Sequence, residues 1–214
     1  MPNLLLASSS PRRRLLLEEA GFDFVAWSPG IDDGELVPGE VTPEQWVAAL
    51  AFLKASAGVG LLPAIEPAFA ADPTGHWLVL GADTLVDQEG ELLGQPRDIE
   101  QARTTIQTLA GNTHQVHTGV ALLDPRTRRR HIFVDSATVA VGEISDADRE
   151  AYLETGHWQG KAGAYNLHER LDAGWPITYE GDPTTIVGLP MSRLLALFEH
   201  MDITPNPPSP AGHQ

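Results

Sequence analysis

Short apolar runs bounded by polar turns recur along this chain and predict its strands. Residues 3–7 form one such run, and residues 77–82 form another that ends at Asp83. Runs of this length without polar alternation are typical of strands that are buried on both faces. Two later runs, at residues 115–123 and 131–141, flank the turn Asp-Pro-Arg-Thr and predict an antiparallel hairpin.

Helical segments lie between these runs and are marked by their capping residues. Pro11 and Gly21 delimit a helix over residues 12–20, and the capping pair Thr42 and Gln45 opens a second helix. The same signals predict further helices at residues 98–111, 145–154 and 190–200. Strands and helices alternate while one strand pair is antiparallel, so the pattern predicts an α/β fold with a mixed central sheet flanked by helices.

The rest of the chain is expected to form one domain with a surface loop and a tail. The second helix is expected to face the core through a stripe of five residues, Trp46, Ala49, Leu50, Leu53 and Ala57. Residues 58–75 lack periodicity and mix Pro, Ala and Gly, which predicts a loop. Residues 204–214 contain four prolines and are expected to be disordered, which leaves residues 1–203 as a single domain.

Composition narrows the class of protein. Of the 214 residues, 42% are hydrophobic and 20% are charged, which is the range of globular domains. The absence of cysteine excludes disulfides, thiolate metal sites and a cysteine nucleophile. The formal net charge of −15 repels polyanions and argues against nucleic acid or an anionic membrane as a partner, although a smaller anion can still bind in a local basic pocket.

The first residues do not have the order of a signal peptide. A run of three leucines precedes the basic cluster, whereas a signal peptide places its charges first. No stretch of the sequence is expected to approach the roughly 20 apolar residues of a membrane-spanning helix. These observations predict a cytoplasmic protein without a membrane partner.

The segment Ser-Ser-Ser-Pro-Arg-Arg-Arg at residues 8–14 has the parts of a phosphate cradle. Ser8 and Ser10 offer hydroxyls, while Arg12 and Arg13 offer guanidinium groups at a helix start, where anions are favoured. The alternative is a capped helix whose arginines are solvated. Clustered positive charge at a helix N-terminus opposes the helix dipole, which favours the anion-binding interpretation.

The chain's two lysines stand against twelve arginines and are therefore worth inspecting. Lys54 follows the apolar stripe of the second helix. Lys161 lies in the glycine-flanked segment Gly-Lys-Ala-Gly-Ala-Tyr, where backbone or side chain can approach a ligand closely. The alternative for both is a lysine whose ammonium group reaches solvent.

Carboxylates at two places are candidates for catalysis or metal binding. Asp83 directly follows an apolar strand, a position where α/β sheets commonly present catalytic groups, so it is expected to activate water or ligate a metal. The alternative is a structural aspartate that caps a turn with Thr84. Asp32 and Asp33 lie in an acidic loop and are candidate oxygen ligands for a hard cation such as Mg²⁺, with a solvated loop as the alternative.

Six segments together resemble the Maf family of nucleoside triphosphate pyrophosphatases. In order they are LLLASSSPRRRLLL, LGADTLV, GQPRD, HTGVAL, GKAGAY and VGLPM, and the resemblance runs from Leu4 to about Leu197. It implies a Maf/ITPase-like mixed-sheet α/β fold with a cleft between two lobes, dependence on Mg²⁺ or Mn²⁺, and a homodimer. It also implies that Asp83 accepts the proton of the attacking water and that Arg12 and Thr84 help to select the base.

Three positions depart from the family's pattern. Gln95 in GQPRD stands where a lysine is usual, so one phosphate contact is lost or passes to Arg97. Asp33 stands where a glutamate is common, which shortens a metal ligand by one methylene group. His168 stands where pyrimidine-selective members have Gln and 7-methyl-GTP-selective members have Glu; it either reads the base edge or points to solvent.

The sequence therefore predicts an enzyme that hydrolyses dTTP or UTP to the monophosphate and pyrophosphate. Water deprotonated by Asp83 attacks the α-phosphorus, and a divalent metal is held by Asp33 and Asp83. Arg12 and Thr84 match the pyrimidine-selective branch. The charge of the departing pyrophosphate is neutralised by the metal and by Arg12, Arg13, Lys54 and Lys161. Three alternatives remain: a 7-methyl-GTP-type pyrophosphatase, a non-catalytic nucleotide-binding regulator of growth or division, and a generic soluble α/β domain without a nucleotide site.

Overall fold

A computed structural model describes residues 2–31, 36–65 and 76–205. Its strands are β1 (Asn3–Ala7), β2 (Val25–Trp27), β3 (Trp77–Gln88), β4 (Glu91–Leu93), β5 (Thr113–Leu123), β6 (Arg130–Val141) and β7 (Ile177–Glu180). Its helices are α1 (Pro11–Glu19), α2 (Pro43–Ile65), α4 (Ile99–Leu109), α5 (Asp146–Glu154), α6 (Leu167–Asp172), α7 (Pro183–Val187) and α8 (Met191–His200), with a 3-10 turn η1 at Ala162–Ala164.

The seven strands form one mixed sheet, which confirms the predicted fold class. Their order is β2-β1-β3-β5-β6-β7, with β4 attached to β3. β1 pairs in parallel with β2 and β3, whereas β3 with β5, β5 with β6 and β6 with β7 are antiparallel. The predicted hairpin is the β5–β6 pair.

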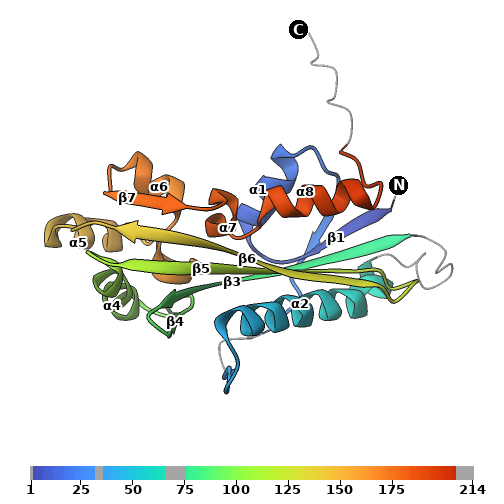
Figure 1. Ribbon diagram of the computed structural model, residues 1–214, viewed down its shortest axis with the longest axis horizontal. Coiled ribbons are helices and arrows are strands. Elements are labelled where there is room, and N and C mark those ends of the chain that lie inside the picture. The colour runs from blue at the N-terminus through green and yellow to red at the C-terminus, as the bar shows by residue number, and fades with distance from the viewer. Residues whose placement is uncertain (1, 32–35, 66–75, 206–214) are drawn as a thin grey trace, which may run out of the picture.

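The helices cover both faces of the sheet and leave two lobes (Figure 1). α2 lies along one face, and α1, α7 and α8 lie on the other. The far end of the sheet carries α4, α5 and α6, so that the long strands β3, β5 and β6 run through both lobes. Three groups of buried apolar side chains form the core, represented by Ile106 in the lobe with α4 and α5, Phe198 between α8 and the sheet, and Val79 between the sheet and α2.

Glycines in the sheet allow α2 to pack unusually close to it. A Cβ atom at Gly81 of β3 would lie 2.5 Å from the carbonyl oxygen of Ala51, and one at Gly119 of β5 would lie 2.5 Å from the carbonyl oxygen of Val47. Gly58 makes the matching approach from the helix side, because a Cβ there would lie 2.7 Å from the Cβ of Ala7. The helix backbone therefore rests directly on the strands that carry the cleft residues.

The predicted core stripe of α2 is wrong for most of its members. Ala49 and Leu53 are exposed, and Trp46 and Ala57 are half-buried, so Leu50 alone of the five is buried. Apolar residues surround much of this helix, so their spacing does not identify the face that packs. The buried residues of α2 are Val47, Leu50, Ala51, Ala55, Gly58 and Leu62, and the small ones among them, Ala51, Ala55 and Gly58, permit the close approach to the sheet.

Helix α2 also continues beyond the predicted loop start. Residues 58–65 are helical, so the expectation of a loop over 58–75 is wrong for this part, and residues 66–75 lie outside the described residues. In the sequence, Gly58 and Pro63 suggest that the helix ends early. In the structure, Gly58 allows close packing against the sheet, and Pro63 lies close to the end of the helix. With 23 residues, α2 is by length and composition apolar enough to cross a membrane, which contradicts the expectation of no such stretch.

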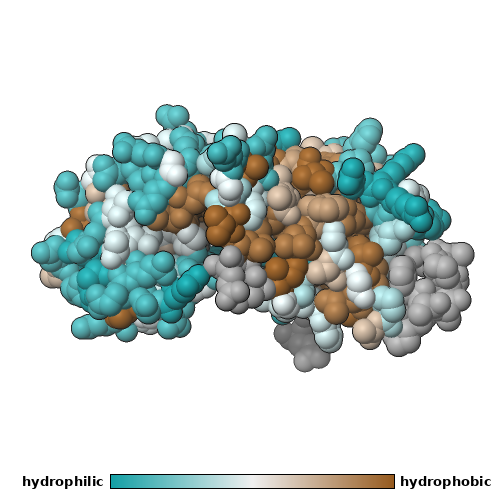
Figure 2. All heavy atoms as spheres, turned by 90° about the horizontal axis from the view of Figure 1, so that it is seen from below, coloured by the Kyte–Doolittle hydropathy of each residue, from teal (hydrophilic) through white to brown (hydrophobic). Residues whose placement is uncertain are grey.

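The surface of α2 is partly apolar while its other face is part of the core. Figure 2 shows this side of the molecule, with hydrophobic residues gathered over its middle. The buried residues of α2 pack against β1, β3 and β5. Core helices of globular proteins meet the same length and composition criteria, so α2 by itself identifies no membrane partner.

β3 continues well past the predicted strand end. It pairs with β5 from Val79 to Asp87, so Asp83 lies inside a twelve-residue strand rather than directly after one. Its parallel partner β1 is paired only as far as Leu6, opposite Leu80. Asp83 therefore follows the end of the parallel pair, and the space beyond β1 is where the cleft opens. The predicted tail lies outside the described residues from 206 onward.

Candidate active site

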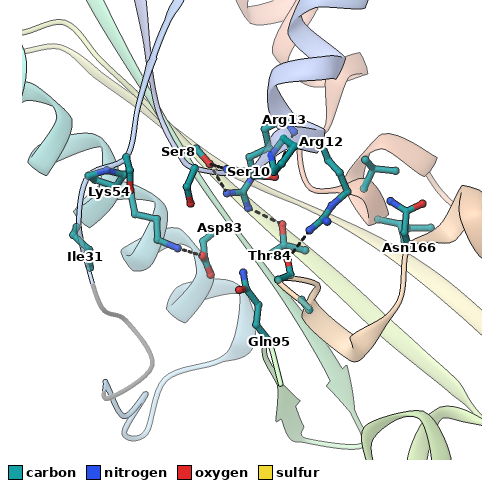
Figure 3. A pocket seen from close by; sticks show the side chains of 18 of the residues that line it. Ser8, Ser10, Arg12, Arg13, Ile31, Lys54, Asp83, Thr84, Gln95 and Asn166 are labelled. Atoms are coloured by element: carbon teal, nitrogen blue, oxygen red, sulfur yellow. Dashed lines mark hydrogen bonds and ion pairs between the residues drawn. The ribbon is translucent and has the colours of Figure 1, made fainter. Parts of the chain in front are cut away.

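A cleft of about 310 Å³ opens beyond the end of β1, between the two lobes (Figure 3). Asp83 and Thr84 of β3 belong to its lining. The lobe that contains β1, α1 and α2 contributes Ser8, Ser9, Ser10, Pro11, Arg12, Arg13, Ser28, Pro29, Ile31 and Lys54. The remaining lining residues are Gln95, Gly160, Ala162, Tyr165, Asn166, Ile186 and Val187. The fold thus brings together most of the residues predicted to form the site.

Asp83 forms an ion pair with Lys54 in the cleft. The Nζ of Lys54, on α2, lies against Oδ1 of Asp83, and their side chains are 15% and 9% exposed. Figure 3 shows the two side chains pointing toward each other from opposite elements. An ionised carboxylate can accept a proton from water, and an ammonium beside it can neutralise the charge of a phosphate leaving group. The pair therefore joins the two groups that an anhydride hydrolysis needs.

Arg13 links three segments of the chain at the cleft. It is 8% exposed, and its guanidinium donates to the carbonyl oxygen of Gly188 at 2.7 Å, to Oγ of Ser8 at 3.2 Å and to Oγ1 of Thr84 at 3.1 Å. Thr84 also shares a hydrogen bond of 2.9 Å with Thr118. These contacts show Arg13 bonded to protein acceptors, so its predicted phosphate contact stays a prediction beside an evident structural role.

The serines and Arg12 of the predicted cradle also bond to the protein. Ser10 caps α1 by accepting from the amide of Arg13 at 3.4 Å, and Ser8 accepts from the amide of Ser10 at 3.2 Å. Arg12 donates to the carbonyl oxygen of Gly160 at 2.9 Å, which connects the lobes across the cleft. Burial lowers the pKa of the Arg12 guanidinium, while the nearby Glu169 carboxylate acts in the opposite direction.

Lys161 and His168 do not line the cleft. Lys161 is buried and forms an ion pair with Glu169 of α6. Burial lowers the pKa of the Lys161 ammonium, and Glu169 opposes this shift. His168 lies exposed on α6. Their roles in phosphate binding and base reading stay predictions, and Asp32 and Asp33 lie outside the described residues.

Sequence reasoning missed Asn166 and Tyr165. Asn166 caps α6 by accepting from the amide of Glu169 at 3.1 Å, and the spacing Asn-x-x-Glu is a capping signal that was readable. Tyr165 shares a buried hydrogen bond of 2.9 Å with Nε2 of His114. Burial lowers the pKa of His114 to about 4 and raises that of Tyr165. No sequence signal connects residues this far apart.

The residues described fit a metal ion that arrives with a substrate. Asp83 is the sole acidic side chain among the described lining residues, and this part of the chain holds no group of three His, Asp or Glu residues suited to a metal. Mg²⁺ is commonly held by one or two carboxylates together with substrate phosphates. One carboxylate facing a phosphate-sized cleft matches that mode of binding.

Comparisons with known proteins agree with one another. The family model described as "Maf-like protein" matches residues 3–201. The chain is 39% identical to the dTTP/UTP pyrophosphatase of Pelotomaculum thermopropionicum, covering 93% of this chain and 96% of that protein. It is 37% identical to the dTTP/UTP pyrophosphatase of Salmonella typhimurium, covering 94% of each.

Among solved structures the similarity is more distant. The Ham1 protein of Staphylococcus aureus matches with a TM-score of 0.40 and 14% identity, over 65% of this chain and 71% of that one.

Proposed function

Because this chain belongs to the Maf family, we propose that its cleft hydrolyses dTTP and UTP to the nucleoside monophosphate and pyrophosphate. The observation that carries the proposal is the Asp83–Lys54 pair inside a cleft lined by hydroxyls and arginines. The relatives named above are dTTP/UTP pyrophosphatases, and they cover nearly the whole chain. The protein is accordingly a hydrolase of acid anhydrides.

In the proposed reaction Asp83 acts as the general base. Its carboxylate accepts a proton from water as the water oxygen bonds to the α-phosphorus, and the bond from that phosphorus to the bridging oxygen breaks. Pyrophosphate leaves with the bonding electron pair. Lys54, which lies against Asp83, neutralises the negative charge that develops on the leaving group. Arg13 keeps Ser8 and Thr84 in place around this centre.

A divalent cation, Mg²⁺ or Mn²⁺, belongs to the proposal. Asp83 would hold it together with the substrate phosphates, and Asp33 is the further ligand predicted from sequence. When bound, the cation supplies positive charge to the triphosphate. Lys54 and Arg12 supply the protein's own positive charge along the same cleft.

Two of the alternatives from sequence are nucleotide-binding proteins, and they differ from this proposal in measurable ways. A 7-methyl-GTP pyrophosphatase is expected to have an aromatic ring at the position of Arg12, where it can stack on a cationic purine, whereas Arg12 and Thr84 offer polar groups. A nucleotide-binding regulator would bind the substrate without releasing pyrophosphate. The names of the relatives favour the pyrimidine nucleotides.

The test of the proposal is product analysis on the purified chain. UTP, dTTP, CTP and 7-methyl-GTP are each incubated with Mg²⁺, and nucleotides, pyrophosphate and orthophosphate are separated and quantified. UMP and pyrophosphate in equal amounts, with UTP and dTTP preferred, are expected. UDP and orthophosphate as first products would contradict attack at the α-phosphorus, and a preference for 7-methyl-GTP would contradict the substrate assignment.

The wider expectations stay predictions. They are a cytoplasmic location, the absence of nucleic-acid and membrane partners, and a homodimer. The net charge of −15 supports the expectation about nucleic acid, because it repels a polyanion outside the cleft. The homodimer rests on the family resemblance.

A further inference from the structure

Asn166 lies at the end of the cleft away from the reacting groups. It lines the cleft beside Arg12, whereas Lys54 and Asp83 lie on the opposite side of the view in Figure 3. It is 9% exposed and stands between η1 and α6. Lys54 is placed beside the leaving pyrophosphate, so a triphosphate whose α-phosphorus lies at Asp83 would extend its nucleoside away from Lys54 and toward Asn166.

The orientation of the Asn166 amide is fixed by the helix that it caps. Oδ1 accepts from the backbone N–H of Glu169 at 3.1 Å, so the oxygen is turned toward the first turn of α6. The NH₂ group must then point the other way. Figure 3 shows the amide nitrogen on the side of the cleft where Arg12 lies. Asn166 thus presents hydrogen-bond donors to the cleft.

The cleft offers apolar surface in addition to the donors at this end. Arg12 has only donors, and one of them is used by the carbonyl oxygen of Gly160. Tyr165, Ile186 and Val187 also line the cleft and offer apolar surface to a flat ring. A base whose polar edge carries acceptors complements this combination. A base that turns an amino group toward Asn166 would place donor against donor.

We propose that Asn166 selects uracil and thymine over cytosine by donating from Nδ2 to the carbonyl oxygen at C4 of the base. The inference rests on the proposed function, since it requires a nucleoside triphosphate whose α-phosphorus lies near Asp83. C4 is on the edge of a pyrimidine that faces away from the sugar, so it reaches the end of the cleft farthest from the phosphates. Cytosine carries an amino group at that position. His168, the residue expected from sequence to read the base edge, is exposed on α6 and does not line the described cleft. Asn166 does line it, beside Arg12.

The test compares UTP with CTP in variants that retain the helix cap. Asn166→Asp and Asn166→Ser both keep an oxygen that can accept from Glu169, because Asp and Ser are good N-cap residues. Asn166→Asp replaces the donor with an acceptor, and Asn166→Ser removes it without adding charge. Gln107→Glu makes the same amide-to-carboxylate change at an exposed position of α4 and serves as the matched control.

We expect the ratio of kcat/KM for UTP to that for CTP to fall at least about tenfold in both Asn166 variants, because an unpaired donor or acceptor in a binding site weakens recognition by this order. The control is expected to keep the wild-type ratio. General repulsion of the triphosphate by the new carboxylate affects both substrates equally and cancels in the ratio. Circular dichroism and thermal melting verify that each variant is folded.

A measurement on the wild-type protein is independent of any variant's folding. In 4-thio-UTP the C4 oxygen is replaced by sulfur, a weak acceptor, so its kcat/KM is expected to lie about tenfold below that of UTP. Equal use of UTP and 4-thio-UTP, or an unchanged UTP-to-CTP ratio in folded Asn166 variants, would show that Asn166 only caps α6. Wild-type protein that releases no pyrophosphate from any of these nucleotides would instead refute the proposed function.

Discussion

Arg13 shows how a single buried residue holds the parts of the cleft together. Its guanidinium joins Ser8, Thr84 and Gly188, which belong to three separate segments of the chain. A lysine has one compact donor group and cannot reproduce this planar fork. Each buried acceptor that loses its hydrogen-bond donor lowers the free energy of unfolding.

We therefore expect Arg13→Lys to lower the free energy of unfolding by about 2 kcal/mol and the melting temperature by about 4–8 °C. Arg14→Lys is the control, because Arg14 is the exposed neighbour in the same helix. Urea denaturation of both variants measures the difference. Equal stability of the two variants would mean that the three hydrogen bonds of Arg13 do not hold the cleft together.

His114 makes a second prediction, on pH dependence. Burial lowers its pKa to about 4, and the ordinary value of about 6.5 applies to the unfolded chain. Above pH 6.5 the ring is neutral in both states. As pH falls from 6.5 toward 4, the unfolded chain binds a proton that the folded protein does not, so stability decreases. From pH 7 to pH 5 this contribution is about 2 kcal/mol.

The measurement compares His114→Gln with His157→Gln, an exposed histidine. Urea denaturation at pH 7 and at pH 5 gives the change in stability for each variant. The wild type and His157→Gln are expected to lose about 2 kcal/mol more than His114→Gln. Three identical pH dependences would show that His114 does not stay neutral in the folded protein.

Much of the candidate site could be predicted at the scale of residues. Ser8, Ser10, Arg12 and Asp83 lie in local motifs, and the fold brings all of them to one cleft. The ion pairs of Lys54 and Lys161 could not be predicted, because their partners are chosen by packing between distant elements. The same limit explains why both lysines are expected from sequence to bind phosphate although only one lines the cleft.

At the scale of elements, α2 depends on close contact with the sheet. Gly58 faces β1 and β3, where a Cβ would lie 2.7 Å from Ala7 and 2.8 Å from Val79. Gly60 belongs to the same helix, and a Cβ there would meet nothing within 4 Å. One helix thus contains a glycine that packing requires and another that it does not.

Substitution by alanine is expected to act in opposite directions at these two positions. Gly58→Ala should lose about 2 kcal/mol through overpacking, whereas Gly60→Ala should gain about 0.5–1 kcal/mol, since alanine favours the helix. Thermal and urea denaturation measure both. Stabilisation by Gly58→Ala would contradict the close approach of α2 to the sheet, and destabilisation by Gly60→Ala would contradict its open surroundings.

Local sequence signals predict where helices and strands lie better than they predict where these elements end or which face is buried. The caps at Thr42, Asp98 and Ser145 are present in the structure, because side chain and backbone lie within one turn of each other. The predicted end of β3 is wrong, because pairing with β5 continues the strand beyond Asp83 and the apolar run of β3 alone does not reveal this pairing. The short elements β7, α6 and α7 were not predicted, since each has too few residues for a period.

At the scale of the whole molecule, charge decides how a triphosphate can bind. The protein has a formal net charge of −15, and a nucleoside triphosphate carries several negative charges of its own. Attraction must come from the local cations Arg12 and Lys54 and from a cation bound with the substrate. The cleft concentrates these groups at the junction of the two lobes.

Removal of divalent cations is therefore expected to abolish hydrolysis. EDTA in excess over Mg²⁺ should reduce pyrophosphate release to background, and added Mg²⁺ or Mn²⁺ should restore it. Thermal melting in EDTA is expected to be unchanged, because the described residues hold no group of metal ligands that would stabilise the fold. Full activity in EDTA would contradict the proposed requirement for a cation.

In the proposed reaction Asp83 is the base that activates water. Asparagine is nearly isosteric but cannot accept the proton, so Asp83→Asn is expected to lower the rate of pyrophosphate release from UTP by at least ~10²-fold while the protein remains folded. Asp98→Asn is the matched control outside the cleft, because asparagine also caps a helix well, and it should retain wild-type activity. An Asp83→Asn protein that keeps more than about a third of the wild-type rate would show that another group takes the proton.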